Sequence, residues 1–206
     1  HLASRRQRQM CIRDSIKSGP KIISFVAGIK SRKYLRINKN AKLLRAMPNT
    51  SSRFDLGITA LFNISFKKTD MSLIKNLFKR FSKVIELNNE LKMDQFTGLV
   101  GSGPAYFFYL LKVYEKELLK MCNGNKYEVN AIMTNLLEGV SQSLKVNNDL
   151  DDLIKMVASK KGTTEAGLKS FSINKIDKIF EDGLKKAIKR SKEISCLLYT
   201  SDAADD

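Results

Sequence analysis

The sequence is poor in the residues that usually carry metal, disulfide or nucleophilic chemistry. It contains no tryptophan, a single histidine at position 1, and three cysteines, Cys11, Cys122 and Cys196. These cysteines have neither the spacing of a metal site nor the even number of a disulfide framework. We therefore expect no bound metal, and a reducing, cytoplasmic setting fits the pattern best.

Long hydrophobic runs are also absent. The longest unbroken apolar run covers residues 105–111, which is far too short to cross a bilayer. No charged-then-apolar signal segment opens the chain, so secretion is not indicated. The hydrophobic content of 43% is that of an ordinary globular protein, and we expect no membrane partner.

Acidic residues are outnumbered, with 37 lysines and arginines against 21 aspartates and glutamates and a formal charge of +16. Such an excess can favour nucleic acids, because each cation placed on a phosphate releases a counterion. Here the lysines are spread through nearly every segment, and no recognised nucleic-acid motif is present. A lysine-rich solvated surface is the favoured interpretation, and nucleic-acid binding is a lower-ranked alternative.

Both ends of the sequence lack any periodic pattern. Residues 1–15 and 196–206 resemble translated sequencing-adapter or library sequence, and we exclude them from the fold argument as one would a cloning scar. Genuine disordered termini are the alternative interpretation.

The first half of the remainder alternates strand and helix patterns. Apolar and β-branched runs predict strands at residues 21–27, 44–49, 57–63 and 84–87. Residues 31–44 have weak helical character, and Thr69 or Asp70 can cap a further helix. The apolar face of that helix would be Leu73, Ile74, Leu77, Phe78 and Phe81. The alternation indicates an α/β unit with a largely parallel sheet over residues 16–90.

The second half, residues 91–195, shows only helix signals. Pro104 occupies a position typical of the first turn of a helix. Apolar residues at helical spacing predict one long amphipathic helix, namely Val129, Ile132, Met133, Leu136, Leu137, Val140 and Leu144. We therefore expect an all-helical part after a boundary near residues 88–94.

The segment at residues 94–106, DQFTGLVGSGPAY, is the most informative in the chain. Gly101 and Gly103 permit a tight turn, and Pro104 opens a helix. The pair looks like the start of a G-x-G-x-x-G dinucleotide motif, but Tyr106 stands at the third position and no clear strand precedes it. From chemistry alone, glycines that allow tight helix packing are the favoured interpretation.

This segment strongly resembles the D-x-x-T-G-L-x-G-S-G-P-A-Y signature of the pyrroline-5-carboxylate reductases. Residues 45–50, RAMPNT, resemble the R-x-M-P-N-T-P loop of that family, with Ser51 in place of the usual proline. Residues 26–29, VAGI, resemble its A-A-G-I strand end, and residues 162–168 are similar to its G-T-T-x-x-G-L segment. The four motifs occur in the family's order.

The resemblance implies a fold and an activity. Its fold is the C-terminal portion of a Rossmann NAD(P)-binding domain followed by an all-helical dimerisation domain, which agrees with the α/β-then-α division. Its activity is hydride transfer from NADPH or NADH to the cyclic imine 1-pyrroline-5-carboxylate, which gives L-proline. The implied partners are that small-molecule substrate and a second copy in a homodimer or higher homo-oligomer, with no nucleic acid and no membrane.

The resemblance also implies a substrate site at Gly162, Thr163 and Thr164. Backbone N–H groups at a helix start suit the substrate carboxylate, and the Thr164 hydroxyl would meet the ring nitrogen as the catalytic contact. The alternative is that Thr163 merely caps a helix. Lys160 and Lys161 replace the family's proline and first glycine, so they could assist anion binding or alter the loop.

For the cofactor, the resemblance implies contacts at two strand ends and one acidic position. These residues are Phe25, Val26, Ala27, Pro48, Asn49 and Glu90. The alternatives are a core strand for the first three, turn formation for the next two, and a solvated surface acid for Glu90. The mechanism needs no catalytic histidine, cysteine or metal, because the cofactor supplies the chemistry and the protein supplies orientation.

The family's opening strand, G-x-G-x-x-G turn and helix have no counterpart in this sequence. Because these elements hold the cofactor pyrophosphate, we expect a clipped reductase that binds NAD(P)H poorly. A non-catalytic helical dimerisation module is the main alternative.

The first prediction is that this polypeptide has little reductase activity. NADPH-dependent turnover of 1-pyrroline-5-carboxylate, followed by the loss of NADPH absorbance, is expected to lie far below the rate of a full-length relative. A rate close to that of the relative would contradict the expectation.

Overall fold

The computed structural model describes residues 19–200, with side chains as far as residue 195. The end segment 1–15 and the side chains of 196–206, with Cys11 and Cys196, lie outside the described residues. The backbone of residues 196–200 continues the last helix. Among the described residues, no helix combines the length and apolar character needed to span a membrane.

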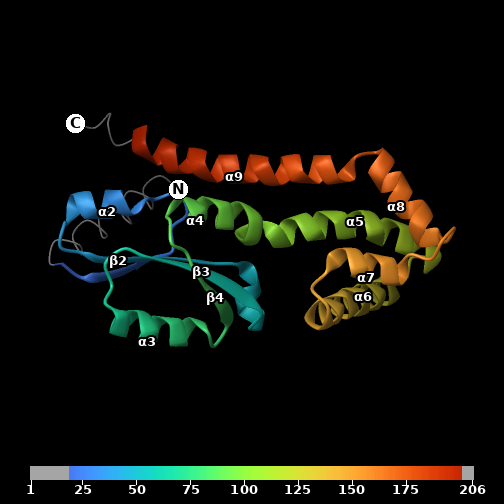
Figure 1. Ribbon diagram of the computed structural model, residues 1–206, viewed down its shortest axis with the longest axis horizontal. Helices are drawn as coiled ribbons and strands as arrows, with labels where there is room; N and C mark the ends of the chain where they lie inside the picture. Colours follow the sequence, from blue (N-terminus) through green and yellow to red (C-terminus); the bar gives the residue numbers. More distant parts are fainter. Residues whose placement is uncertain (1–18, 201–206) are drawn as a thin grey trace. The chain divides into compact units, whose positions relative to one another are not determined.

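The N-terminal half contains a four-stranded sheet in the order β1-β2-β3-β4 (Figure 1). The strands are β1 (Lys21–Ser24), β2 (Lys42–Pro48), β3 (Gly57–Asn63) and β4 (Ser82–Glu86). β1 pairs with β2 and β3 pairs with β4 in parallel, as predicted, but the sheet as a whole is mixed. The β2–β3 pair is antiparallel, because a short 3-10 turn, Thr50–Phe54, joins the two strands and is too short for a parallel crossover.

Strand β2 is buried on both faces, which explains its nearly continuous apolar sequence. Leu44 and Ala46 pack in a core with helix α3 (Lys68–Phe78). Leu43 points to the opposite face and packs with Tyr34 of helix α2 (Ser31–Ile37). Figure 1 shows α2 and α3 on opposite sides of the sheet. The alternation of side chains along a strand therefore divides the core into two layers.

The predicted apolar face of α3 is wrong in part. Met71 and Phe78 are buried and Ile74 packs against them, whereas Leu73 and Leu77 are 70% and 54% exposed. Residues at i, i+3 and i+7 share a helix face, and this stripe is the one that meets β2 and β3. The helix also begins at Lys68 after Lys67, so neither Thr69 nor Asp70 is its cap.

The glycine-rich segment forms helix rather than the predicted tight turn. Helix α4 (Leu91–Phe96) continues into a π-helical turn, Thr97–Gly101, and then into α5 (Gly103–Met121). Pro104 lies in the first turn of α5, as predicted. Gly98 faces helix α9 (Ile176–Thr200), where a Cβ would lie 2.8 Å from the Ile188 nitrogen. Tight packing therefore occurs at Gly98 and not at the two glycines for which it was predicted, because a Cβ on Gly101 would have no neighbour closer than 3.9 Å and one on Gly103 none within 4 Å.

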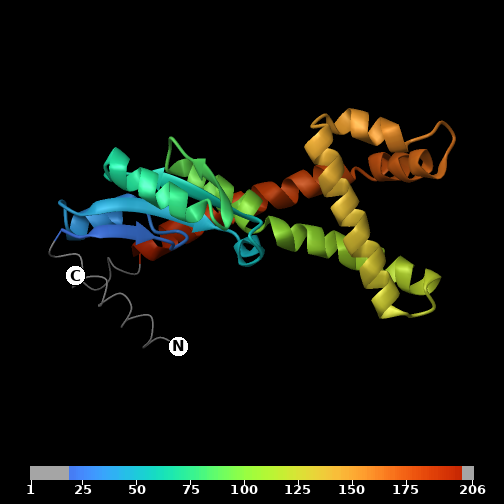
Figure 2. The same cartoon turned by 90° about the horizontal axis from the view of Figure 1, so that it is seen from below.

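The described chain forms two compact units that divide at residues 104/105 and 183/184. The first unit holds the sheet, α2 to α4 and the C-terminal part of α9. The domain boundary predicted at 90/91 stays a prediction. The second unit is all-helical. Its complete helices are α6 (Lys126–Val146), α7 (Leu150–Val157) and α8 (Thr163–Ile173). Figure 2 shows α6, in yellow, running from the end of α5 towards α7.

Side-chain caps start two of these helices. Asn125 accepts hydrogen bonds from the first backbone amides of α6, and Asp149 does the same for α7. Such caps satisfy donors that have no partner within the helix. A small core at the α5–α6 junction contains Leu118, Cys122 and Val129. Burial raises the pKa of the Cys122 thiol, which keeps it protonated near neutral pH and unsuited to nucleophilic chemistry.

The second prediction concerns the approach of α9 to Gly98. Gly98→Ala is expected to lower the free energy of unfolding by about 1–3 kcal/mol, because the new methyl group meets the Ile188 backbone. Gly101→Ala is the matched control, since its Cβ would have no neighbour closer than 3.9 Å. Urea unfolding of both variants checks this, and equal stability of the two would contradict it.

Candidate functional site

The predicted cofactor residues gather at one edge of the sheet. Because β1 and β2 are parallel, their carboxyl ends meet at the same edge, which is where ligands bind in open α/β sheets. β1 ends at Ser24, three residues earlier than predicted, so Phe25, Val26 and Ala27 form a loop. Phe25 and Val26 are 51% and 41% exposed. The alternative that these residues are core strand is therefore wrong.

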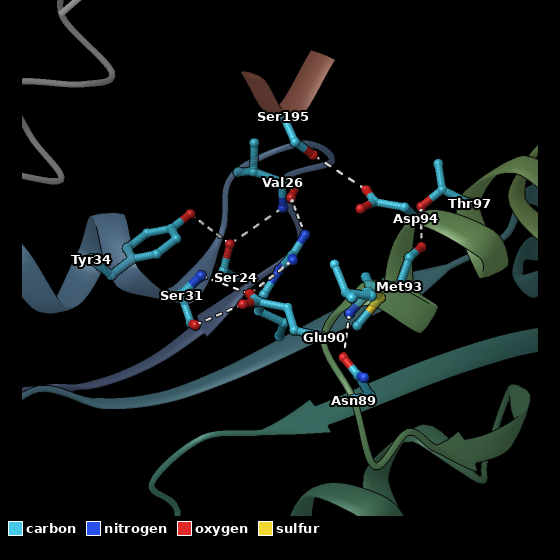
Figure 3. A network of polar contacts seen from close by, with 12 residues as sticks. Ser24, Val26, Ser31, Tyr34, Asn89, Glu90, Met93, Asp94, Thr97 and Ser195 are labelled. Carbon is cyan, nitrogen blue, oxygen red and sulfur yellow. Dashed lines mark hydrogen bonds and ion pairs between the residues drawn. The ribbon is translucent and has the colours of Figure 1, made fainter. Parts of the chain in front are cut away.

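Hydrogen bonds near Ser24 and close packing at Gly28 connect this loop to the rest of the fold. The Ser24 and Tyr34 hydroxyls are hydrogen-bonded at 2.6 Å, and the Val26 amide donates to the Ser24 Oγ over 3.4 Å (Figure 3). Gly28 has φ +80°, and a Cβ there would lie 2.7 Å from the Ile194 Cγ2 of α9. Only glycine meets both conditions, so the G of the VAGI motif is explained by conformation and packing.

Glu90 is not a solvated surface acid. Its Oε1 accepts from the Ser31 amide at 2.7 Å and from the Arg45 Nη1 at 3.0 Å, while its Oε2 accepts from the Ser31 hydroxyl at 2.9 Å (Figure 3). Ser31 is the first residue of α2, whose own N-cap Lys30 makes no side-chain cap. Glu90 therefore caps α2 from a distant part of the chain, where its charge also favours the helix dipole.

Arg45 is the partner that the sequence interpretation missed. Its side chain is 4% exposed, and it lies on β2 in register with Ser24. Besides its ion pair with Glu90, it donates from Nη2 to the Val26 carbonyl over 3.4 Å. The available signal was a single charge inside an apolar strand, since a buried arginine requires a partner.

A second missed group is the buried carboxylate of Asp94, which is 4% exposed on α4. The hydroxyls of Ser191 and Ser195, one turn apart on α9, donate to its Oδ1 at 3.1 and 3.2 Å. Asp94 thereby joins α4 to the C-terminal part of α9. Nothing in a single sequence connects these positions, because each serine on its own is an ordinary helix residue.

Asn49 closes the turn between β2 and β3. Its side-chain Oδ1 accepts from the Ile58 backbone amide at 2.9 Å, and its backbone amide donates to the Ile58 carbonyl at 3.1 Å. The turn-forming alternative for Asn49 is therefore confirmed. Pro48 is the last residue of β2 and is half-buried. Cofactor contact at both residues stays a prediction.

The predicted substrate residues lie at the start of α8 in the second unit. Gly162 is the N-cap and Thr163 is the first helical residue, so the alternative that Thr163 caps the helix is wrong. A Cβ on Gly162 would meet the Ser159 Oγ at 2.3 Å, which explains the glycine. The first amides of a helix have no intrahelical acceptor and can bind an anion.

The surroundings of this helix start are of mixed charge. Lys160 and Lys161 are exposed, and the carboxylate of Glu165 accepts a hydrogen bond from the Lys161 amide. Glu165 therefore occupies one amide before the helix and leaves those of Thr163 and Thr164 for a ligand. Thr164 is half-buried.

No group of three or more histidine, cysteine, aspartate or glutamate residues within 19–195 could hold a metal ion. The positions that the sequence singled out are divided between the two units. The first unit holds Phe25, Val26, Ala27, Pro48, Asn49 and Glu90, and the second holds Gly162, Thr163 and Thr164.

Comparison with known proteins connects this geometry to a family. The family model described as pyrroline-5-carboxylate reductase dimerisation matches residues 90–194. A pyrroline-5-carboxylate reductase of Staphylococcus epidermidis is 33% identical over 188 residues, which cover 89% of this chain and 68% of the relative. One from Staphylococcus aureus is 33% identical over 177 residues, which cover 84% and 64%.

Solved structures agree in fold. The pyrroline-5-carboxylate reductase of Coxiella burnetii matches with a TM-score of 0.78 at 25% identity, over 89% of this chain and 69% of that one. The enzyme from Streptococcus pyogenes matches with a TM-score of 0.77 at 28% identity, over 84% and 67%. The Plasmodium falciparum enzyme, solved with NADP bound, shares the fold with a TM-score of 0.77 at 22% identity.

The family model covers residues 90–194, and the relative and the solved structure that each match 89% of the chain extend the similarity into the half that holds the sheet. The chain therefore belongs to the pyrroline-5-carboxylate reductase family, the NAD(P)H-dependent oxidoreductases of proline biosynthesis.

Proposed function

We propose that this chain holds the nicotinamide end of NADPH or NADH at the β1–β2 edge and 1-pyrroline-5-carboxylate at the start of α8. The observation that carries the proposal is that residues 25–27 and the pair Pro48 and Asn49 lie at the carboxyl ends of two parallel neighbouring strands. In open α/β sheets this edge is the general ligand site.

The residues at this edge fit a nicotinamide ring. Phe25 and Val26 offer exposed apolar surface, and the exposed Ala27 is small enough to let a flat ring approach the backbone. Bound NAD(P)H supplies the hydride, which passes to the imine carbon of the substrate. The chain's own residues hold the ring, orient one of its faces and exclude water from it.

The start of α8 fits the substrate. The amides of Thr163 and Thr164 would bind the carboxylate, supported by the helix dipole and by the charge of the exposed Lys160 and Lys161. The Thr164 hydroxyl would hydrogen-bond to the ring nitrogen, which would take from solvent the proton that the reduction of the imine requires. Glu165 would steer the carboxylate towards these two amides, because it already occupies the amide of Lys161.

A second copy of the chain is the partner that suits the helical unit. On α6, Leu136, Leu137, Val140 and Leu144 are each at least 42% exposed and share one face. Leaving such a face in water costs about 25 cal/mol per Å² of apolar surface. We propose a homodimer in which this face is covered, in a cytoplasmic setting and without nucleic-acid or membrane partners.

The third prediction tests the substrate site without the cofactor. The product L-proline, titrated into the isotope-labelled chain, is expected to shift the amide resonances of Thr163 and Thr164. Thr164→Val should weaken this binding about threefold to tenfold, because it removes one hydrogen-bonding hydroxyl and keeps the shape.

Thr134→Val is the matched control, since the Thr134 hydroxyl donates only to carbonyls of its own helix. Equal L-proline affinity in the Thr164 and Thr134 variants, or shifts confined to other parts of the chain, would rule out the proposed substrate role.

The fourth prediction concerns the apolar face of α6. Val140→Asp should halve the particle mass measured by light scattering, from twice the chain mass of 23.3 kDa to that mass. The physical reason is the cost of burying an unpaired carboxylate. Gln142→Asp places the same charge on the opposite face of α6 and should leave the dimer intact. A monomeric parent chain, or dissociation by both variants, would contradict the proposal.

A further inference from the structure

The loop that leaves β1 is held by groups from elsewhere in the chain. Between Ser24 and Ser31 the backbone belongs to neither strand nor helix. Its fixed points are the Val26 carbonyl, which accepts from Arg45, and the start of α2 at Ser31, which donates to Glu90. Because Arg45 and Glu90 form an ion pair with each other, one pair of side chains holds both sections of the loop.

We propose that Arg45 and Glu90 are positioning residues that fix the loop at residues 25–28 in the geometry needed to bind the nicotinamide ring. This inference rests on the cofactor site of the proposed function. It assigns to Glu90 an effect on the cofactor that acts through the loop, since both of its carboxylate oxygens are already engaged by Ser31 and Arg45.

The strand register explains how Arg45 reaches the loop. Arg45 is paired with Ser24, the last residue of β1, and the next turn of the chain brings the Val26 carbonyl within 3.4 Å of Nη2. Nη1 meanwhile binds Glu90 at 3.0 Å. The planar fork of a guanidinium can serve two acceptors at once, whereas the ammonium of a lysine is a compact point charge.

The unsatisfied part of Arg45 supports the same assignment. Nε is buried and has no acceptor among the described residues, and a buried donor without a partner destabilises the fold. A lysine could pair with Glu90 without leaving this donor. Only the guanidinium can also donate to the Val26 carbonyl. We therefore assign this contact the role of holding the loop in place.

The test compares three variants of the full chain. Arg45→Lys keeps the charge opposite Glu90 and loses the reach to Val26, and Glu90→Gln weakens both the ion pair and the cap on Ser31. Lys75→Gln is the matched control, because it removes the exposed ion pair with Glu86, which lies 2.9 Å away in the same unit. Reduced nicotinamide mononucleotide is the probe, since it presents the ring without the adenylate half.

Two quantities are measured by nuclear magnetic resonance, the order parameters of the Val26, Ala27 and Gly28 amides and the affinity for the probe. In the parent and in Lys75→Gln the order parameters should stay near the rigid value of about 0.85, and in Arg45→Lys they should fall below about 0.6. Affinity for the probe should fall about tenfold in Arg45→Lys, as for the loss of one charge-assisted hydrogen bond.

The outcomes separate the two proposals. Looser amides with unchanged probe affinity would overturn the positioning role and leave a structural one. Unchanged order parameters in Arg45→Lys would overturn the anchoring itself. A parent chain whose loop is rigid but does not bind the probe would overturn the cofactor site of the proposed function, and with it this inference. Urea unfolding of the Arg45→Lys and Lys75→Gln variants is measured alongside, to check that both are folded.

Discussion

The first unit depends on a cation that lies inside a strand covered on both faces. Arg45 is 4% exposed on β2, and leaving a buried charge there without a partner would be strongly destabilising. Glu90 compensates it, and Glu90 is delivered by the chain segment that enters α4. The ion pair therefore joins β2, the start of α2 and the start of α4. The same arginine also holds the loop that follows β1, through its hydrogen bond to the Val26 carbonyl.

Periodic patterns predicted the elements of this unit well. β3 begins and ends at the predicted residues, Gly57 and Asn63, because a strand buried on both faces reads as one apolar run between turn residues. For β1 the same kind of apolar run gives a wrong C-terminal boundary, because the strand ends at Ser24 and not at residue 27. Residues 25–27 are as apolar as the strand before them, and they leave the sheet to form an exposed loop at the ligand edge.

What the sequence could not show is which distant residues meet. Met71 and Leu73 are both apolar, and only the position of α3 against β2 decides that the first is buried and the second exposed. Glu90 has the sequence environment of a surface acid, yet Arg45 and Ser31 lie 45 and 59 residues away along the chain and bind it. Family resemblance marked Glu90 as a position of interest, and the structure explains it through contacts that no local pattern carries.

The contact between Asp94 and α9 has a consequence for the order of folding. Ser191 and Ser195 are separated from Asp94 by 97 and 101 residues, and the whole helical unit lies between them in the chain. The ribosome releases the sheet long before it releases these serines. The newly made first unit therefore contains the Asp94 carboxylate without the two hydroxyl groups that later donate hydrogen bonds to it. Closing so long a loop is slow compared with forming local helices. Helix α9 therefore completes the first unit, and the contacts of Asp94 form only after Ser191 and Ser195 have been made.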